Sequence, residues 1–322
     1  MASSRGDVRS TEVRTGRPHA GHARPVATVF AFVQDGEPEQ TPKLTKTPLV
    51  AASDFVVEDV NCRCRSRGWS PPEQSDAYAI VFLRRGCFRR RVNGVDTFMD
   101  PTVVYFERPA DEQQISHPAG GDSCTVVYLS AGLLASIRGG EPTLPDRPIP
   151  TDPALDLHQR LLLTLICDGN DPEEIGEAVV SITANLLERS APTVVSAGRP
   201  ATALARRRIV DGAREALAES PSAGVIELAR RVAVSPHHLS RIFKAETGEA
   251  ISRYRNRLRV RLALERLAEG DPCLARVAAD LGFSDQAHLA RVVHSQLGAP
   301  PSQLRALLRG AAGRNRAGGL PK

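Results

Sequence analysis

The C-terminal third of the sequence contains the same helix-turn-helix pattern twice, and this duplication constrains the fold more than any other feature. Residues 228–250 read LARRVAVSPHHLSRIFKAETGEA, and residues 277–300 read VAADLGFSDQAHLARVVHSQLGAP. In each copy a short amphipathic helix leads through a tight turn into a second helix, which ends at Gly248 or Gly298. Two short helices joined by a tight turn form a helix-turn-helix unit. The sequence therefore predicts two such units.

Each second helix has a recognisable start. Ser235 stands directly before Pro236. A serine hydroxyl can accept a hydrogen bond from an otherwise unpaired backbone N–H, and proline at the first helical position lacks an N–H that would have no partner there. Asp285 takes the place of Ser235 in the second copy, and Leu289 then matches Leu239. These positions predict where both second helices begin.

The adjacent histidines His237 and His238 could mark a metal site, a catalytic dyad or a surface that reads nucleic acid. Histidines that share a metal ion on one helix are three or four residues apart, whereas neighbours point about 100° apart around the axis. A metal site is therefore not expected here. The pair belongs either to a solvated surface or to a nucleic-acid interface.

Between the two units, residues 251–270 (ISRYRNRLRVRLALERLAEG) are expected to form one helix of about 19 residues, or about 28 Å. Recognition helices held apart by such a rod can enter successive major grooves on one face of B-DNA, about 34 Å apart. The arginines at alternate positions of this helix cannot share one face, so we expect most to be solvated and one or two to reach a phosphate. They are Arg253, Arg255, Arg257, Arg259 and Arg261.

The charge of the chain is unevenly distributed. Residues 201–309 hold 18 Lys and Arg against 11 Asp and Glu, while residues 1–200 hold 21 against 26. A basic C-terminal region suggests contact with a polyanion, although a merely solvated basic face would have the same composition. No apolar run approaches the roughly 18 residues needed to span a bilayer, so no membrane association is expected.

Residues 55–130 have a different pattern, with short apolar runs rich in Val, Phe and Tyr between turn residues. The length and spacing of these runs predict a β-sandwich or barrel. Asn93-Gly94 lies between two of the runs and predicts a two-residue type I′ hairpin. The runs are DFVVEDV, AYAIVFL, CFRRRV, VDTFM, TVVYF and CTVVYL.

Two amphipathic helices are expected after the strands, over 151–168 and 172–190. Their apolar stripes suggest a dimer interface, with packing against the barrel as the alternative. The expected fold class is α+β and multidomain: an N-terminal β-barrel with a helical pair, then an all-α domain with two helix-turn-helix motifs joined by a linker helix. The expected parts are a disordered tail (1–50), the barrel (51–135), the helical pair for dimerisation (150–190), a linker (191–202), the DNA-binding domain (203–309) and a disordered tail (310–322).

Residues 203–309 resemble the DNA-binding domain of the AraC/XylS family of bacterial transcription regulators. The resemblance rests on the two helix-turn-helix stretches, on RLRVRLALERL in the linker helix, on Gly-Phe-Ser-Asp at 282–285 and on Gly-x-x-Pro-Ser at 298–302. It implies phosphate contacts from Lys244 and His294. The base-contacting residues that it implies are His237, Ser240, Arg241, Gln286, Ala287, His288 and Arg291.

The chemistry of the base edges favours the arginines among these residues, because a guanidinium can donate two hydrogen bonds to guanine. The second unit departs from the family pattern at two positions. Val293 stands where a phenylalanine is usual, and His294 where a lysine or arginine is usual. Since valine packs less and histidine is mostly neutral, we expect the second unit to bind DNA more weakly than the first.

The strand series resembles, more loosely, the cupin-like sensor barrel that precedes this DNA-binding domain in many family members. A metal-binding cupin would carry a His-x-His pair and a downstream Glu in its first motif, but CFRRRVNGVDTFMDPTVVYFERP contains no histidine. His117 stands alone and is expected in a loop or at the barrel mouth. We therefore expect neither enzyme activity nor a cofactor, with a DNA-tethered cupin enzyme as the competing class.

The barrel cysteines leave another alternative open. Strand alternation puts Cys62 and Cys64 on one face, and Cys87 and Cys124 belong to the same barrel. Thiolates select zinc, copper(I) or oxidants, which would make the chain a thiol-based metal or redox sensor with Cys62 and Cys64 as the candidate ligands. Burial as small hydrophobic side chains is the other interpretation.

The resemblance implies a one-component transcription regulator, most simply an activator, in which the barrel binds a small-molecule effector and the tandem motif binds double-stranded promoter DNA. RNA polymerase and a second copy of the chain are the other expected partners. The few cysteines without a CxxC pair fit a reducing bacterial cytoplasm, where such a protein would associate with the nucleoid.

Overall fold

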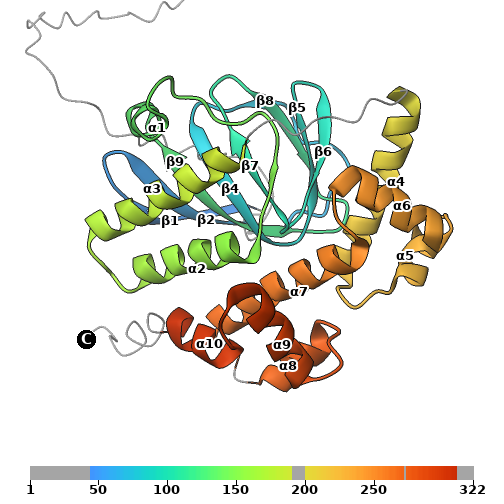
Figure 1. The fold of residues 1–322 in the computed structure, drawn as a ribbon. Coiled ribbons are helices and arrows are strands. Elements are labelled where there is room, and N and C mark those ends of the chain that lie inside the picture. Colours follow the sequence, from blue (N-terminus) through green and yellow to red (C-terminus); the bar gives the residue numbers. More distant parts are fainter. Residues whose placement is uncertain (1–43, 191–199, 272, 310–322) are drawn as a thin grey trace, which may run out of the picture. The chain divides into compact units, whose positions relative to one another are not determined.

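The computed structural model describes residues 44–190, 200–271 and 273–309 (Figure 1). The predicted tails at 1–43 and 310–322 and residues 191–199 of the predicted linker lie outside these ranges. The strands are β1 (Leu44–Ala51), β2 (Phe55–Cys62), β3 (Glu73–Gln74), β4 (Tyr78–Arg85), β5 (Phe88–Val92), β6 (Val95–Met99), β7 (Val103–Glu107), β8 (Glu112–Ser116), β9 (Asp122–Leu129) and β10 (Ile149–Pro150). The helices are α1 (Ala131–Arg138), α2 (Pro153–Cys167), α3 (Pro172–Arg189), α4 (Pro200–Glu219), α5 (Val225–Arg231), α6 (Pro236–Thr247), α7 (Ile251–Ala268), α8 (Leu274–Asp280), α9 (Gln286–Leu297) and α10 (Pro301–Arg309).

Within the described ranges the strands form a six-stranded sheet, β1-β2-β9-β4-β7-β10, and a four-stranded sheet, β3-β8-β5-β6. All their pairings are antiparallel, which confirms the β-rich region that the short apolar runs predict. Asn93 (φ 48°) and Gly94 (φ 82°) both lie in the left-handed region between β5 and β6. This is the backbone of the predicted type I′ hairpin.

The first strand corrects the prediction of a tail that extends to residue 50. Residues from Leu44 to Ala51 form β1, which pairs with β2 along its length. The strand was missed because most of its side chains are exposed, so its sequence has no apolar alternation. It is an edge strand held by backbone hydrogen bonds, and Pro48 stands beside a shift in register, where a missing N–H is tolerated.

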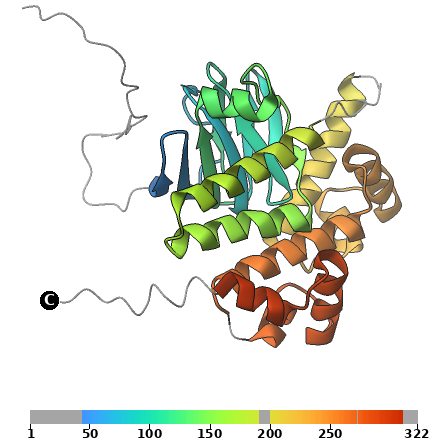
Figure 2. The same ribbon diagram turned by 60° about the vertical axis from the view of Figure 1, so that its left-hand side comes forward.

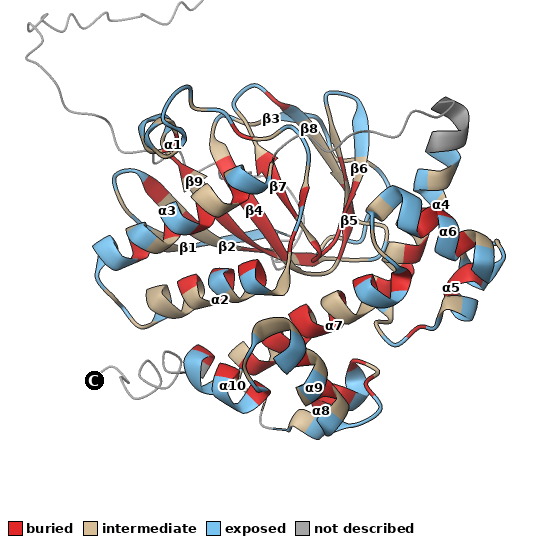
Figure 3. Cartoon of the chain, viewed as in Figure 1, coloured by how far each residue is buried: buried red, intermediate tan, exposed pale blue. Residues whose placement is uncertain are grey.

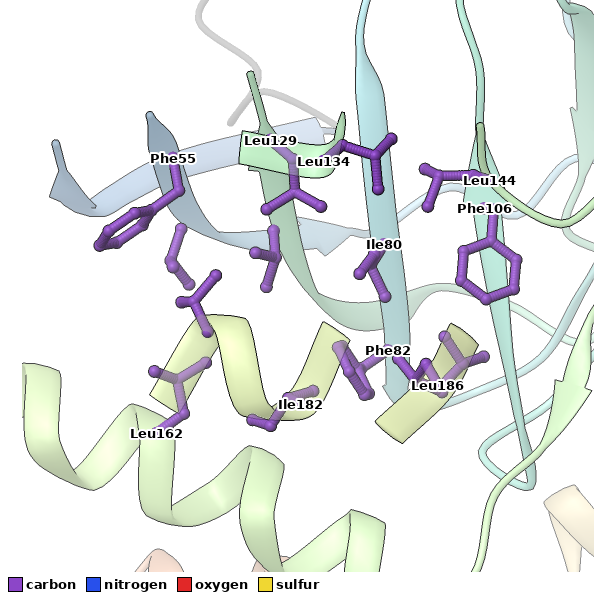
Figure 4. Packing of buried hydrophobic residues seen from close by; sticks show 14 of the residues in the cluster. Phe55, Ile80, Phe82, Phe106, Leu129, Leu134, Leu144, Leu162, Ile182 and Leu186 are labelled. Carbon is purple, nitrogen blue, oxygen red and sulfur yellow. The ribbon is translucent and has the colours of Figure 1, made fainter. Parts of the chain in front are cut away.

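One face of the six-stranded sheet is covered by α2 and α3, which lie side by side across it (Figure 2). Figure 4 shows Ile80 and Phe82 of the sheet facing Leu162 of α2 and Ile182 and Leu186 of α3. Burial of each such side chain stabilises the fold by about 1.5–3 kcal/mol. The apolar stripes of α2 and α3 are therefore buried against the barrel within the chain. This is the alternative to the dimer interface that the sequence suggested.

The other face of the six-stranded sheet turns toward the four-stranded sheet and fills the barrel interior. Val81, Leu83 and Tyr105 of the larger sheet pack there with Phe88 and Met99 of the smaller sheet.

The C-terminal helices form two cores that share one rod. The first core includes Leu228, Leu239 and Phe243, and the second includes Leu289 and Val293. Helix α7 contributes buried side chains to both cores, and Figure 3 shows buried residues along it. The linker helix is thus 18 residues long, close to the expected length. Helix α4 begins at Pro200, so the end of the predicted linker (191–202) is helical.

No helix in the described part of the chain is long and apolar enough to cross a membrane.

Candidate nucleic-acid interface

The first helix-turn-helix unit consists of α5 and α6. Ser235 Oγ accepts a hydrogen bond from the His238 N–H at 3.2 Å, and Pro236 follows at the first helical position, as the sequence predicts. Gly248 closes α6 in the left-handed conformation (φ 78°), and its N–H donates to the Lys244 carbonyl oxygen at 2.9 Å. Both ends of α6 are therefore set by local sequence.

The second unit, α8 and α9, repeats this construction. Asp285 Oδ1 accepts from the His288 N–H at 2.6 Å, and Gly298 (φ 71°) donates to the His294 carbonyl oxygen at 2.8 Å. The backbone hydrogen bond from His288 holds the pKa of the Asp285 carboxyl below its ordinary value. The cap therefore stays ionised at neutral pH, with its negative charge at the positive end of the α9 dipole.

The turns of the two units differ at matched positions. Ala233 has a φ of 55° in the first turn, and Gly282 has a φ of 74° in the second. A Cβ on Gly282 would lie 2.5 Å from Ser222 Cβ and 2.7 Å from Ser222 Cα. The second turn therefore needs glycine both for its conformation and for its approach to the loop between α4 and α5.

This contact gives a testable prediction. We expect Gly282→Ala to lower the free energy of unfolding by about 2–3 kcal/mol, because left-handed strain and overpacking add at this position. The reverse exchange at the matched position, Ala233→Gly, removes the strain and should leave stability unchanged or slightly raised. Urea unfolding of both variants measures the difference; equal midpoints for Gly282→Ala and the native chain would contradict the contact.

The side chains predicted to contact DNA lie outward from these capped helices. In α6, His237, Ser240, Arg241 and Lys244 are exposed. In α9, Gln286, Ala287, Arg291 and His294 are also exposed. The opposite faces of both helices are buried, as the red segments of α6 and α9 in Figure 3 show. The buried residues are Leu239, Ile242, Phe243, Leu289 and Val293.

His288 differs from the other predicted contacts because its ring is engaged locally. It is half-buried, packs edge-on against Phe283 with ring centroids 5.4 Å apart, and its Nδ1 lies 3.1 Å from Ser284 Oγ. Only Nε2 remains for a base or phosphate. In the first unit, His238 Nδ1 lies 3.4 Å from Arg241 Nη2. His238 is thus placed to orient Arg241, and the i,i+3 spacing was the signal that could have indicated it.

The arginines of α7 correct a sequence-based prediction. Arg255 Nη1 donates to the Ala223 carbonyl oxygen at 3.0 Å, and Arg259 Nε to that of Pro221 at 2.7 Å. Arg257 Nη1 donates to the carbonyl oxygens of Thr102, at 3.0 Å, and Thr151. The prediction that these side chains are solvated was therefore wrong, and it was also wrong for Arg261, which is 1% exposed. Among the five alternating arginines from Arg253 to Arg261, Arg253 alone is exposed.

One buried cluster joins α7 and α4 to the barrel through Asp100. Its Oδ2 accepts from Arg214 Nε of α4 at 2.8 Å and from the Tyr254 hydroxyl of α7. Its Oδ1 accepts from Thr102 Oγ1 at 2.6 Å. Burial by itself raises the pKa of Asp100, but Arg214 and these hydrogen bonds hold it below its ordinary value. The carboxylate is therefore charged at neutral pH.

A second buried cluster joins α7 to α2 and β4. Arg261 pairs with Asp156 of α2, and its Nη2 donates to the Leu83 carbonyl oxygen at 2.6 Å. Arg160 of α2 pairs in return with Glu265 of α7 at 2.7 Å. Burial raises the pKa of Glu265, but the surrounding arginines, Arg160 first, hold it below its ordinary value. The arginines of the linker helix therefore bind groups of the protein itself. The helical periodicity of the sequence could not indicate these partners.

The barrel cysteines divide into two pairs. Cys87 and Cys124 are buried. Burial raises the pKa of the Cys87 thiol to about 12, so it is neutral at ordinary pH and behaves as a small hydrophobic side chain. Cys62, which is also buried, and Cys64, which is half-buried, lie beside His117, in the loop after β8. His117 was expected in a loop, but its proximity to the cysteines was not predicted.

Capped tandem helix-turn-helix units with outward basic and amide side chains define a DNA-binding protein of the double helix-turn-helix class. Residues 228–307 match the family model described as a helix-turn-helix domain. The C-terminal region of the chain is therefore an AraC-type helix-turn-helix domain.

Curated relatives cover different parts of the chain. It is 34% identical over 107 residues to the HTH-type transcriptional regulator Rv1931c of Mycobacterium tuberculosis, which covers 30% of this chain and 41% of that protein. It is 24% identical over 272 residues to the HTH-type transcriptional activator RhaS of Escherichia fergusonii, which covers 80% of this chain and 97% of that protein. An AraC-like transcription regulator of Streptomyces lividans is 36% identical over 81 residues, 25% of this chain and 27% of that protein.

Proposed function

We propose that this protein binds promoter DNA through α6 and α9 and regulates transcription in response to a small-molecule effector. The observation that carries the proposal is the pair of matched, capped recognition helices braced by one shared helix, α7. Base contacts are assigned to the α6 residues His237, Ser240 and Arg241. The corresponding α9 residues are Gln286, Ala287, His288 and Arg291, and Lys244 and His294 contact phosphate.

Control of DNA binding by the barrel is supported by the two buried clusters. Arg257 and Arg261 of α7 bond to backbone oxygens of the barrel region, and Tyr254 bonds to Asp100. Because α7 is also part of both helix-turn-helix cores, a change in the barrel can alter the relation between the recognition helices. Such coupling needs only an effector with different affinity for two arrangements.

The effector is proposed to bind in the barrel, near Arg90 of β5. Arg90 is 5% exposed, its guanidinium stacks over the Tyr105 ring at 4.6 Å, and its Nε donates to Gln113 Oε1 at 2.9 Å. Its Nη2 has no hydrogen-bond partner among the described residues. An effector with a carboxylate or another hydrogen-bond acceptor would complete this arrangement.

A homodimer, contact with RNA polymerase, action as an activator and location in the bacterial cytoplasm at the nucleoid complete the proposal. Because the apolar stripes of α2 and α3 are buried within the chain, dimerisation is assigned to other surfaces.

The decisive experiment compares Arg241→Ala and Lys244→Ala on a site footprinted in the DNA around the gene of this protein. We expect Arg241→Ala to lower affinity for that site by about 10- to 100-fold and to relax preference at one base pair, since a bidentate arginine–guanine contact is lost. Lys244→Ala should weaken all sequences alike and reduce the salt slope by about one.

Arg276→Ala is the matched control, because Arg276 is an exposed arginine of α8 outside the assigned contact set. It should leave both affinity and salt slope unchanged. Equal losses on specific and random DNA for Arg241→Ala would refute its reading role.

A further inference from the structure

We propose that Cys62, Cys64 and His117 form a site for Zn²⁺ at one corner of the barrel. The two Sγ atoms and a ring nitrogen of His117 all lie within 4.8 Å of one another. Two thiolates and an imidazole are a donor set that zinc prefers. The site goes beyond the proposed function and does not depend on it.

Backbone pairing brings these three residues together. Cys62 ends β2, where it pairs with Asp122 of β9, and the Cys64 N–H lies 3.4 Å from Cys62 Sγ. The segment that follows is joined to the loop of His117, whose N–H donates to the Ser66 carbonyl oxygen at 2.9 Å. The donors therefore come from two segments held in register, and their grouping does not depend on one flexible side chain.

A close backbone approach holds this corner. A Cβ on Gly121 would lie 1.9 Å from the Cys62 carbonyl oxygen, so only glycine lets the chain after His117 pass this near to β2.

Asp122 supplies the outer support that a metal-binding histidine requires. Its Oδ1 lies 2.6 Å from His117 Nε2, and its Oδ2 accepts from Cys124 Sγ at 3.1 Å. Histidines that bind zinc generally donate their other ring N–H to a carboxylate, which fixes ring orientation. With Nε2 donating to Asp122, Nδ1 is the nitrogen left for the ion. The Phe88 ring, centred 5.5 Å from the His117 ring, packs beside it.

The separation and exposure of the donors suit an ion that enters from solvent. In a tetrahedral site with Zn–S bonds of about 2.3 Å, ligand atoms lie about 3.8 Å apart. The three donor atoms lie within 4.8 Å of one another, so each pair needs to approach by at most about 1 Å to bind the ion. Cys62 is buried, whereas Cys64 and His117 are half-buried and allow entry. Three protein ligands leave a fourth position for water or a small ligand.

The test uses the full chain, reduced and freed of metal by a chelator, and titrates it with Zn²⁺ and with Co²⁺ as a spectroscopic probe. We expect one ion per chain and an intense thiolate-to-cobalt charge-transfer band. Cys64→Ser should lower zinc affinity by at least about 100-fold and weaken this band. Asp122→Asn should lower zinc affinity by about 10- to 100-fold. Cys273→Ser, the same exchange at an exposed cysteine outside the cluster, should change neither.

Unchanged far-UV circular dichroism and thermal midpoint for metal-free Cys64→Ser will show that the variant folds. Binding of less than one ion per chain, native affinity in Cys64→Ser, or a cobalt spectrum without thiolate bands would overturn the site. So would a protein that forms a Cys62–Cys64 disulfide when air oxidises it but takes up no zinc after the disulfide has been reduced. DNA affinity is measured separately, so failure of the metal site and failure of DNA recognition are distinguishable.

Discussion

Asp100→Ala is expected to lower the free energy of unfolding by about 3–5 kcal/mol, the usual loss when one member of a buried ion pair is removed. Asp100 is 1% exposed and accepts hydrogen bonds from Arg214, Tyr254 and Thr102. Its removal leaves the buried Arg214 guanidinium with the longer 3.9 Å ion pair to Asp211 in place of the 2.8 Å pair to Asp100. Urea unfolding followed by circular dichroism measures the loss, and hydrogen exchange in α4 and α7 should rise with it. Asp100→Asn preserves shape and should lose less.

The control is Asp96→Ala, the same exchange in an exposed pair with Arg91. Its unfolding midpoint should stay close to that of the native chain, because exposed ion pairs contribute little. The pH dependence has a definite sign. Since the folded pKa of Asp100 is lowered, its contribution is present above the ordinary carboxyl pKa of about 3.9 and is lost as the pH falls below it. A loss in Asp100→Ala no greater than in Asp96→Ala would contradict the role of the cluster.

Arg261→Met is expected to lower the free energy of unfolding by a similar amount, about 3–5 kcal/mol. The arginine side chain is 1% exposed, as is its partner Asp156, and it also donates to the Leu83 carbonyl oxygen. Methionine fills much of the same volume but leaves a buried carboxylate and a carbonyl oxygen without their donor. Urea unfolding measures the effect, with Arg276→Met as the control at an arginine that is 58% exposed.

A double variant separates the lost pair from lost packing. When both members of a buried ion pair are replaced by apolar residues, the net effect is often small or stabilising. Arg261→Met with Asp156→Leu should therefore recover at least half of the stability lost in Arg261→Met alone. A double variant less stable than Arg261→Met would mean that side-chain packing, and not the uncompensated carboxylate, explains the loss.

Local features of the fold followed from sequence because they depend on residues a few positions apart. The caps at Ser235 and Asp285 and the glycines that end α6 and α9 satisfy backbone groups of the adjacent turn. The Asn93-Gly94 hairpin needs two residues that tolerate positive φ. The strand β1 was missed for the opposite reason: the neighbour that stabilises it is β2, and its own side chains carry no apolar period.

The candidate DNA contacts were also open to prediction, because helical period alone determines which faces of α6 and α9 oppose the buried leucines. The arginines of α7 were not, because the same period assigns them to solvent. Their true partners, such as Asp156, Leu83 and Thr102, are more than a hundred residues away in the chain. A charged side chain is stable in such a place only when those partners are assembled around it.

The duplicated helix-turn-helix units, their boundaries and the β-rich class of the preceding region were determined by the sequence alone, since hydrophobic period and capping act over a few residues. Tertiary structure decided which charges are buried, that Asp100 and Arg261 link the barrel to α7, and that Cys62, Cys64 and His117 meet. The physical reason is that desolvation and ion pairing depend on distance in space, and residues far apart in the chain come close only when the sheets and helices pack.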